Sequence, residues 1–342
     1  MDFVLFIIGL AAIIKGADWL TDGAASIARH FGIPTIVVGL TIVAMGSSAP
    51  ELVVSVMSAI EGNVDMALGN VVGSNIFNIL AIMGITAMVS PVIVDRANVL
   101  YDVPFLILSS VCLAIAAFDT FINGSNATNS ISRTDGLLLL CIFSIFMSYT
   151  MAIARNNKHR EPVGNANADK EVTSVGNAAD SSVESNEDAT MKPMKAVLLC
   201  IVGLACLIAG GDMLVDGASG IASSLGVSQS IIALTIVSSG TSAPELAASV
   251  MAARKGDTAM ALGNVVGSVV FNVFFVLGCA ATVCPLGIGG VSVTDIVVLL
   301  VASITLWAFC KFGNTFYTIT RIEGTVMVLM AIAYYAYLIL NI

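Results

Sequence analysis

Apolar segments of about 20 residues follow one another along almost the whole chain, and no other feature limits the fold so strongly. Such a segment is long enough to cross a bilayer as a helix, and a helix satisfies its own backbone hydrogen bonds in lipid. Only 11% of the 342 residues are charged, against about 25% in soluble domains. The sequence therefore predicts an all-α membrane protein with about ten transmembrane helices, over residues 3–28, 33–60, 65–90, 97–117, 134–154, 195–222, 227–253, 259–284, 291–311 and 323–340.

A single long polar segment, residues 155–192, divides five predicted helices from five. It is rich in Asn, Ala, Ser, Asp and Glu, so it cannot bury a core and is predicted to be a disordered loop. Its basic residues place it in the cytoplasm by the positive-inside rule, which puts both chain termini outside. These residues are Arg155, Lys158, Arg160, Lys170 and Lys192.

An internal repeat relates the two halves, residues 1–154 and 193–342. The stretch GSSAPELVVSVMSAIEGNVDMALGNVVGSNIFN from Gly46 matches GTSAPELAASVMAARKGDTAMALGNVVGSVVFN from Gly240, at a constant offset of 194 residues (240 − 46). Five helices separate equivalent points, so the second copy is predicted to enter the membrane from the opposite side. Inverted repeats are typical of carriers that work by alternating access, which a channel does not require.

Glu51 and Glu245 occupy equivalent positions deep inside apolar segments, where a carboxylate costs at least about 2.5 kcal/mol. Each follows a glycine, two small hydroxyl residues and a proline. Proline and glycine break a helix and free backbone carbonyls. We therefore expect two broken helices that present oxygen atoms at one depth, with hydroxyls from Ser47, Ser48, Thr241 and Ser242.

A second motif in each half, GNVVGS followed by FN, places a serine and an asparagine four residues apart on one helix face. The pairs are Ser74 with Asn78 and Ser268 with Asn272. Ligands that are all oxygen suit calcium or sodium and argue against zinc, copper or iron. The seven cysteines lie in apolar runs without a CxxC motif and are interpreted as packing residues, so no cofactor is expected.

Several polar and small residues have structural interpretations instead. Close helix packing accounts equally well for the glycines and asparagines of the repeated motif: Gly69, Gly73, Gly263, Gly267, Asn70 and Asn264. Asp18, Asp22, Asp212 and Asp216 suit capping, hydration or gating better than direct ligation, and Lys15 is expected to pair with Asp18. Solvated loop charge is the expectation for Glu61, Asp65 and Asp257.

These motifs resemble the calcium/cation antiporter superfamily, most closely its prokaryotic sodium/calcium exchanger branch. The resemblance covers nearly all of the chain outside the central loop and is carried by alpha motifs over residues 41–78 and 235–272, with GADWL and GGDML before them. It implies a bacterial or archaeal plasma (inner) membrane and gating helices that slide against a core. It also implies that Glu51 and Glu245 bridge the ion, that Asn78 lines the middle site, and that Ala44 and Ser238 add carbonyl oxygens at sodium positions.

The chain departs from that family pattern in the second repeat. Asn272 stands where many exchangers have aspartate, Ser238 replaces a more usual alanine, and Val269 stands opposite Asn75 of the first repeat. The site therefore holds two carboxylates, and coupling to sodium or to protons stays open. The central loop is also too short for the large calcium-sensing domains of animal exchangers.

Taken together, the sequence predicts a secondary antiporter, functional as a monomer, that exports Ca²⁺ in exchange for Na⁺ and works among membrane lipids. The alternatives are a proton-coupled Ca²⁺/Mn²⁺ antiporter and, from another class, a cation channel. An enzyme is not expected, because His30 and His159 lie outside the predicted core and no HExxH motif is present. The net charge of −9 argues against binding to nucleic acid.

Overall fold

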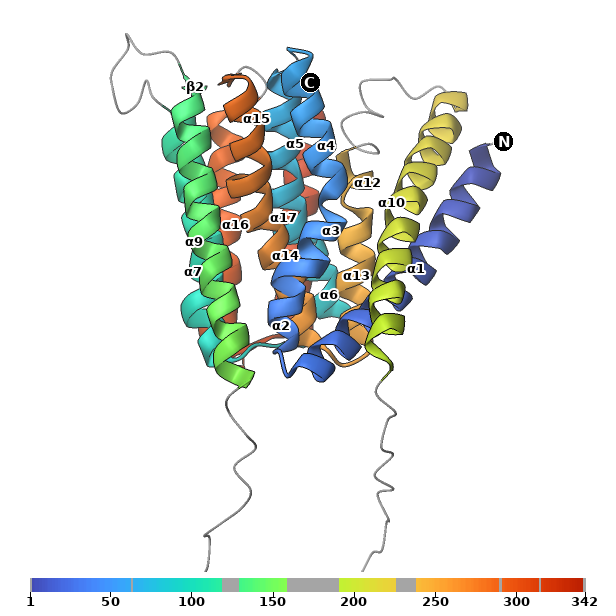
Figure 1. Ribbon diagram of the computed structural model, residues 1–342. Coiled ribbons are helices and arrows are strands. Elements are labelled where there is room, and N and C mark those ends of the chain that lie inside the picture. The colour runs from blue at the N-terminus through green and yellow to red at the C-terminus, as the bar shows by residue number, and fades with distance from the viewer. Residues whose placement is uncertain are drawn as a thin grey trace, which may run out of the picture.

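The computed structural model describes residues 2–62, 64–118, 129–158, 191–225, 238–288, 291–313 and 315–340. Figure 1 shows a bundle of long helices that run roughly side by side. We call the end where α9 stops and α10 starts the loop face, and the end where α1 starts the terminus face. Both chain ends lie toward the terminus face (Figure 1).

Two groups of elements make up the bundle. In the first half they are α1 (Asp2–Phe31), α2 (Thr35–Val38), the π-helical η1 (Gly39–Val43), α3 (Ala44–Ser47), α4 (Ala49–Ile60), α5 (Val64–Ile76), the π-helical η2 (Phe77–Ile82), α6 (Met83–Val89), β1 (Val92–Ile93), α7 (Arg96–Ala117), β2 (Ser130–Ile131) and α9 (Arg133–Lys158). In the second half they are α10 (Pro193–Ser224), α12 (Ser238–Gly240), α13 (Ala243–Arg254), α14 (Thr258–Phe271), the π-helical η4 (Asn272–Leu277), α15 (Gly278–Val283), β3 (Leu286–Gly287), α16 (Val293–Phe312), β4 (Thr318–Ile319) and α17 (Arg321–Leu340).

The prediction of an all-α membrane architecture is confirmed. Among the described residues, eight helices are long and apolar enough to cross a membrane, and a ninth span arises if the bent pair Thr35–Ser47 and Ala49–Ile60 is counted. The span expected over 227–253 falls partly outside the described residues. The same is true of most of the polar segment 155–192, although α9 continues through its first residues to Lys158.

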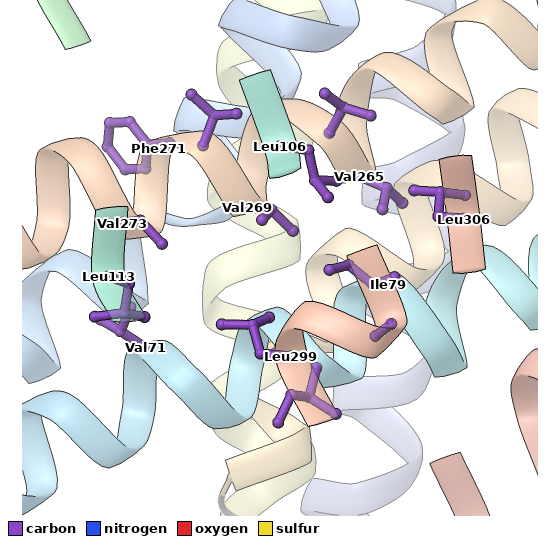
Figure 2. Close-up of a cluster of buried hydrophobic side chains, with 14 of the residues drawn as sticks. Val71, Ile79, Leu106, Leu113, Val265, Val269, Phe271, Val273, Leu299 and Leu306 are labelled. Carbon is purple, nitrogen blue, oxygen red and sulfur yellow. The ribbon is translucent and has the colours of Figure 1, made fainter. Parts of the chain in front are cut away.

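Two continuous helical rods form the centre of the bundle. In the most apolar 18 residues of Met66–Val89 and of Thr258–Val283, 78% and 83% of the residues are buried, against 22–39% in the other six long helices. Figure 2 shows how Val71 and Ile79 of one rod and Val265 and Val269 of the other lie among leucines of α7 and α16. Because lipid is as apolar as leucine, close packing is the main source of stability in such a core.

Two short strand pairs join the halves. Val92 and Ile93 pair with Ile319 and Thr318, and Ser130 and Ile131 pair with Gly287 and Leu286, in both cases antiparallel. Each pair thus joins one strand from the first half to one from the second. The pairs fix the ends of the outer helices α7, α9, α16 and α17 relative to the two central rods.

Helices α1 and α10 pack against each other through glycines spaced seven residues apart. Gly9 and Gly16 of α1 face Gly210 and Gly203 of α10, and Gly23 faces Ala196. At each of these glycines an added Cβ atom would approach backbone of the partner helix within 2.6–2.9 Å. This spacing brings the backbones of two apolar helices close together, as small residues do in membranes. We therefore treat α1 and α10 as one rigid pair at the side of the bundle (Figure 1).

Two expectations about charged residues can be compared with the structure. Lys15 does pair with Asp18, at 3.0 Å. The expectation of solvated loop charge was wrong for Asp257, whose carboxylate accepts hydrogen bonds from Met260 N (3.0 Å) and Thr35 Oγ1 (2.8 Å). It caps α14 and joins that helix to α2, because a helix start leaves backbone N–H groups unpaired. Glu61 is exposed, as expected, and the side chain of Asp65 lies outside the described residues.

The glycine packing of α1 on α10 leads to a prediction with an internal control. In Gly210→Ala the new methyl would meet Gly9 O and Ile13 N at 2.9 Å, whereas in Gly211→Ala its nearest neighbour would be Pro244 Cγ at 3.5 Å. We expect Gly210→Ala to cost about 1–3 kcal/mol of stability and Gly211→Ala to cost much less. Thermal melting of the purified protein in detergent measures both, and equal melting temperatures would contradict the rigid pair.

Candidate ion-binding site

Each half of the chain contains a helical break directly before the helix that carries its buried glutamate. The chain bends by 47° between the segments Thr35–Ser47 and Ala49–Ile60. Ser48 and Ser242 stand at the breaks with nearly the same backbone angles, φ −85° and ψ 12° against φ −90° and ψ 9°. A proline follows in the first turn of α4 and of α13, where its missing N–H costs no hydrogen bond.

The breaks place Glu51 and Glu245 in the first turn of α4 and of α13. Both side chains are fully buried. The N-terminus of a helix carries partial positive charge, so this position favours the ionised carboxylate. In the part of the chain that the structure describes, neither glutamate forms an ion pair with a lysine or arginine. The helix ends therefore offset only part of the burial cost.

Hydroxyl groups connect each glutamate to the opposite half. Ser48 Oγ donates to Glu245 Oε1 at 2.7 Å, and Ser242 Oγ donates to Glu51 Oε1 at 3.2 Å. Both serines occupy N-cap positions, yet neither caps its own helix. Forgoing a cap costs about 1 kcal/mol, which the bond to a carboxylate offsets. The side chains of Thr241 and Ser47 also interact with Glu51 and Glu245 respectively.

Among the described residues, the second oxygen of each glutamate is buried without a hydrogen-bond partner, and so are four further oxygens of the repeated motif. The charges of the two carboxylates lie near enough to interact. An unsatisfied buried polar atom costs about 1–3 kcal/mol, so a group of them is difficult to explain by packing alone. The atoms are Glu51 Oε2, Glu245 Oε2, Ser74 Oγ, Ser268 Oγ, Asn78 Oδ1 and Asn272 Oδ1.

The central rods bring these oxygens to the same region. Asn78 lies in η2, which packs against α13, and Asn272 begins η4, which packs against α4. Each asparagine is thus on a helix that contacts the glutamate helix of the other half. The π-helical turns were not expected from the sequence. Such turns are rare and often occur at functional sites, because they widen the helix and re-aim side chains.

Asn75 is a polar residue of the site that was not among the predicted ligands, although it was noted as the counterpart of Val269. Its Oδ1 accepts a hydrogen bond from Asn272 Nδ2 at 3.2 Å, which leaves Asn272 Oδ1 unpaired. In the second half Val269 stands at the equivalent position, and neither amide atom of Asn78 has a hydrogen-bond partner within the described part of the chain. The position of Asn75 directly after Ser74 in the motif was a signal that could have identified it.

Asn70 and Asn264 support the glutamate helices from behind. Asn264 Nδ2 donates to Glu245 O at 3.1 Å and to Ser249 Oγ at 2.8 Å, and its Oδ1 accepts from Ser47 Oγ at 3.4 Å. Asn70 makes the equivalent contacts with Glu51 O (3.5 Å) and Ser55 Oγ (3.0 Å). These asparagines hold the glutamate backbone, so the packing interpretation describes them better than a ligand role.

The family resemblance also implied two backbone carbonyl ligands, those of Ala44 and Ser238. Ala44 is buried, and its carbonyl accepts hydrogen bonds from Ser48 N (3.0 Å) and Ser47 Oγ (3.3 Å). Ser238 begins α12, and its side chain lies outside the described residues. Within the described residues no group of three or more His, Cys, Asp or Glu side chains is gathered as a metal ligand set. A cation here would rely on two carboxylates and several neutral oxygens, a set typical of calcium or sodium sites.

The fold and this oxygen-lined centre define a class, the membrane antiporters that carry inorganic cations. The chain belongs to the sodium/calcium exchanger family: the model of the family "Sodium/calcium exchanger protein" matches residues 1–152 and 195–340. It is 35% identical to the putative antiporter CaxA of Alkalimonas amylolytica, over 99% of this chain and 98% of that one. It is 29% identical to the sodium/calcium exchanger MaX1 of Methanosarcina acetivorans, over 98% and 97% of the two chains.

A solved structure shows the same fold. The sodium-calcium exchanger NCX_Mj, soaked with 10 mM Na⁺ and zero Ca²⁺, superposes with a TM-score of 0.76 and is 29% identical in sequence. The match covers 98% of each chain. The family is one of exchangers, and the resemblance seen in the sequence motifs is confirmed.

The two supporting asparagines give a matched pair for mutation. Asn264 is 1% exposed and its Nδ2 lies 3.1 Å from Glu245 O, whereas Asn70 is half-buried and its Nδ2 lies 3.5 Å from Glu51 O. We expect Asn264→Ala to lower the free energy of unfolding by about 1–3 kcal/mol and Asn70→Ala to lower it less. Thermal melts without added Na⁺ or Ca²⁺ measure this, and a larger loss in Asn70→Ala would contradict the account.

Proposed function

We propose that this protein exports Ca²⁺ in exchange for Na⁺ by alternating access. The observation that supports this most is the pair of buried carboxylates, one from each half. Each is held by a serine of the other half, and each has one oxygen with no hydrogen-bond partner in the ranges that the structure describes. In this proposal Glu51 and Glu245 bridge the ion. The other ligands are oxygens of Asn78, Asn272, Ser47, Ser48, Thr241, Ser242, Ser74 and Ser268, with the carbonyls of Ala44 and Ser238.

The charge of the site explains why the two ions would bind alternately. Ca²⁺ between two carboxylates gives a neutral centre, and Na⁺ ions would compete for the same oxygens. Moving a charged centre past apolar helix surface is costly, so the gating helices would move much faster when the site is occupied and neutralised than when it is empty. The rigid pair α1 and α10, packed beside the broken helices, is the element that we propose to move.

The orientation follows from the basic residues. Arg29, Arg96, Lys255 and Arg321 lie at helix ends on the loop face, as do the first residues of the polar segment (Figure 1). We therefore propose that the loop face is cytoplasmic and the terminus face is outside, in the plasma membrane of a bacterial or archaeal cell. Inward flow of Na⁺ down its gradient would then drive Ca²⁺ outward. We propose that a single chain is sufficient for this exchange.

Transport by reconstituted protein tests this proposal. Proteoliposomes loaded with Na⁺ should take up Ca²⁺ when diluted into Na⁺-free buffer, and an imposed pH gradient alone should drive little uptake. Uptake driven equally well by the pH gradient would favour the proton-coupled Ca²⁺/Mn²⁺ antiporter, since the two glutamates could carry protons. Flux per protein far above carrier rates would favour a channel.

Replacing either bridging carboxylate should remove exchange. Glu51→Gln and Glu245→Gln each take one negative charge from the centre, so we expect the apparent Ca²⁺ affinity to fall at least roughly 100-fold, as ligand charge sets calcium affinity. Glu171→Gln, the same change in the central polar segment, is the control and should exchange normally. Exchange at the parental rate in both site variants would overturn the site assignment.

A further inference from the structure

Lys255 ties α1 to the far end of the helix that carries Glu245. Its Nζ atom lies 2.6 Å from Asp18 Oδ1 and 2.7 Å from Asp22 Oδ1, and it donates to Asp18 O at 2.9 Å. The three contacts use all three N–H groups of the ammonium. Asp18 and Asp22 are four residues apart and therefore share one face of α1. Lys255, the residue directly after α13, is thus bonded to two successive turns of α1.

The position of this cluster relates it to the ion site. Lys255 follows α13 directly, and Glu245 is in the first turn of that helix. Ten residues of helix span about 15 Å, so the cluster lies between the proposed site and the loop face. Lys255, Asp18 and Asp22 are 28%, 30% and 47% exposed in their side chains. The cluster is therefore partly exposed and is not part of the proposed ligand set.

The repeat gives this cluster a counterpart with the opposite charge. At the offset of 194 residues (255 − 61), Asp18 and Asp22 correspond to Asp212 and Asp216, but Lys255 corresponds to Glu61. All three residues of the counterpart are acidic and exposed. If the halves exchange conformations, closure of the terminus face would bring Glu61 toward two aspartates. Because like charges repel, these acidic residues disfavour closure of the terminus face. At the loop face, the bonds of Lys255 to Asp18 and Asp22 favour closure.

Helix packing also favours closure of the loop face over closure of the terminus face. At the loop face α1 packs on α13, and Lys255 joins them. No comparable packing of α10 on α4, the equivalent contact, occurs among the described residues. In Figure 1 the α1–α10 pair lies near the bundle at the loop face and leans away from it toward the terminus face.

We propose that Lys255, Asp18 and Asp22 form a charged latch that holds the loop face closed and biases the ion-free protein toward the arrangement open at the terminus face. This inference rests on the alternating-access function proposed above. Because α1 and α10 form one rigid pair, release of the latch at the loop face moves the whole pair. Glu61 prevents an equivalent latch at the terminus face, so the energies of the two arrangements are unequal even with no ion bound.

Hydrogen exchange measured by mass spectrometry tests the latch without any transport. The protein is placed in lipid nanodiscs in choline chloride, free of Na⁺ and Ca²⁺. In Lys255→Gln we expect faster exchange in peptides covering residues 15–31 and slower exchange in those covering 212–225. Two partly exposed ion pairs correspond to a shift of roughly threefold to tenfold in the ratio of the two arrangements. Raising the choline chloride concentration should reduce the difference from the parent by screening the pairs.

Three further variants complete the test. Arg254→Gln removes a positive charge one residue earlier, and its hydrogen-exchange pattern should match that of the parent. Lys255→Arg keeps the positive charge and should also show the parental hydrogen-exchange pattern. Glu61→Lys should build the mirror latch and shift exchange in the same direction as Lys255→Gln. Faster exchange at both faces in Lys255→Gln, or the same pattern in Arg254→Gln, would overturn the latch. The latch and the ion site can fail separately. If hydrogen exchange in Lys255→Gln shifts in opposite directions at the two faces while Glu51→Gln and Glu245→Gln still transport Ca²⁺ normally, the latch is supported and the proposed ion site is refuted.

Discussion

The structure depends on keeping two carboxylates in the dry centre of a membrane bundle without a basic partner among the described residues. Several interactions together offset the free-energy cost of burying Glu51 and Glu245. The start of a helix lies behind each carboxylate, and a serine of the opposite half donates to one of its oxygens. The other oxygen has no hydrogen-bond partner among the residues that the structure describes. In the proposed function a bound cation supplies the remaining stabilisation, so ion binding and the stability of the centre are coupled.

This requirement explains why the break in each helix is so similar. The glycine and proline around the small hydroxyl residues start a new helix inside the membrane, and the serine at the start turns away from its own helix toward the other glutamate. Asn70 and Asn264 then hold the glutamate carbonyls in place. Rigid central rods and strand pairs that join the halves keep the six unpaired oxygens together. In the proposed mechanism the α1–α10 pair at the side is the part that moves.

Much of this arrangement could be predicted from the sequence because its causes are local. Apolar length predicts spanning helices, and the doubled Gly-Ser/Thr-Ser-Ala-Pro-Glu pattern predicts the breaks and the glutamates. The twelve proposed ligand positions include the partners that the structure brings together, such as Ser48 with Glu245. The internal repeat is visible in the sequence, and its equivalent residues Ser48 and Ser242 make equivalent contacts at the site.

The remaining features depend on contacts between distant segments, which no local pattern specifies. The role of Asn75 depends on where Asn272 lies, and the capping role of Asp257 includes Thr35 from the other half. The seven-residue glycine spacing in α1 and α10 is visible in the sequence, but its meaning depends on which helices meet. The bond between Lys255 and the aspartates of α1 likewise needed the packing of α1 on α13.

The central claim is that a cation lies between the unpaired oxygens of Glu51 and Glu245. Anomalous diffraction from crystals soaked with Sr²⁺ in place of Ca²⁺ tests it most directly. The account predicts one strong anomalous peak between the two carboxylates that disappears when excess Na⁺ is added. A peak elsewhere, or a density map in which either glutamate turns toward lipid, would contradict it.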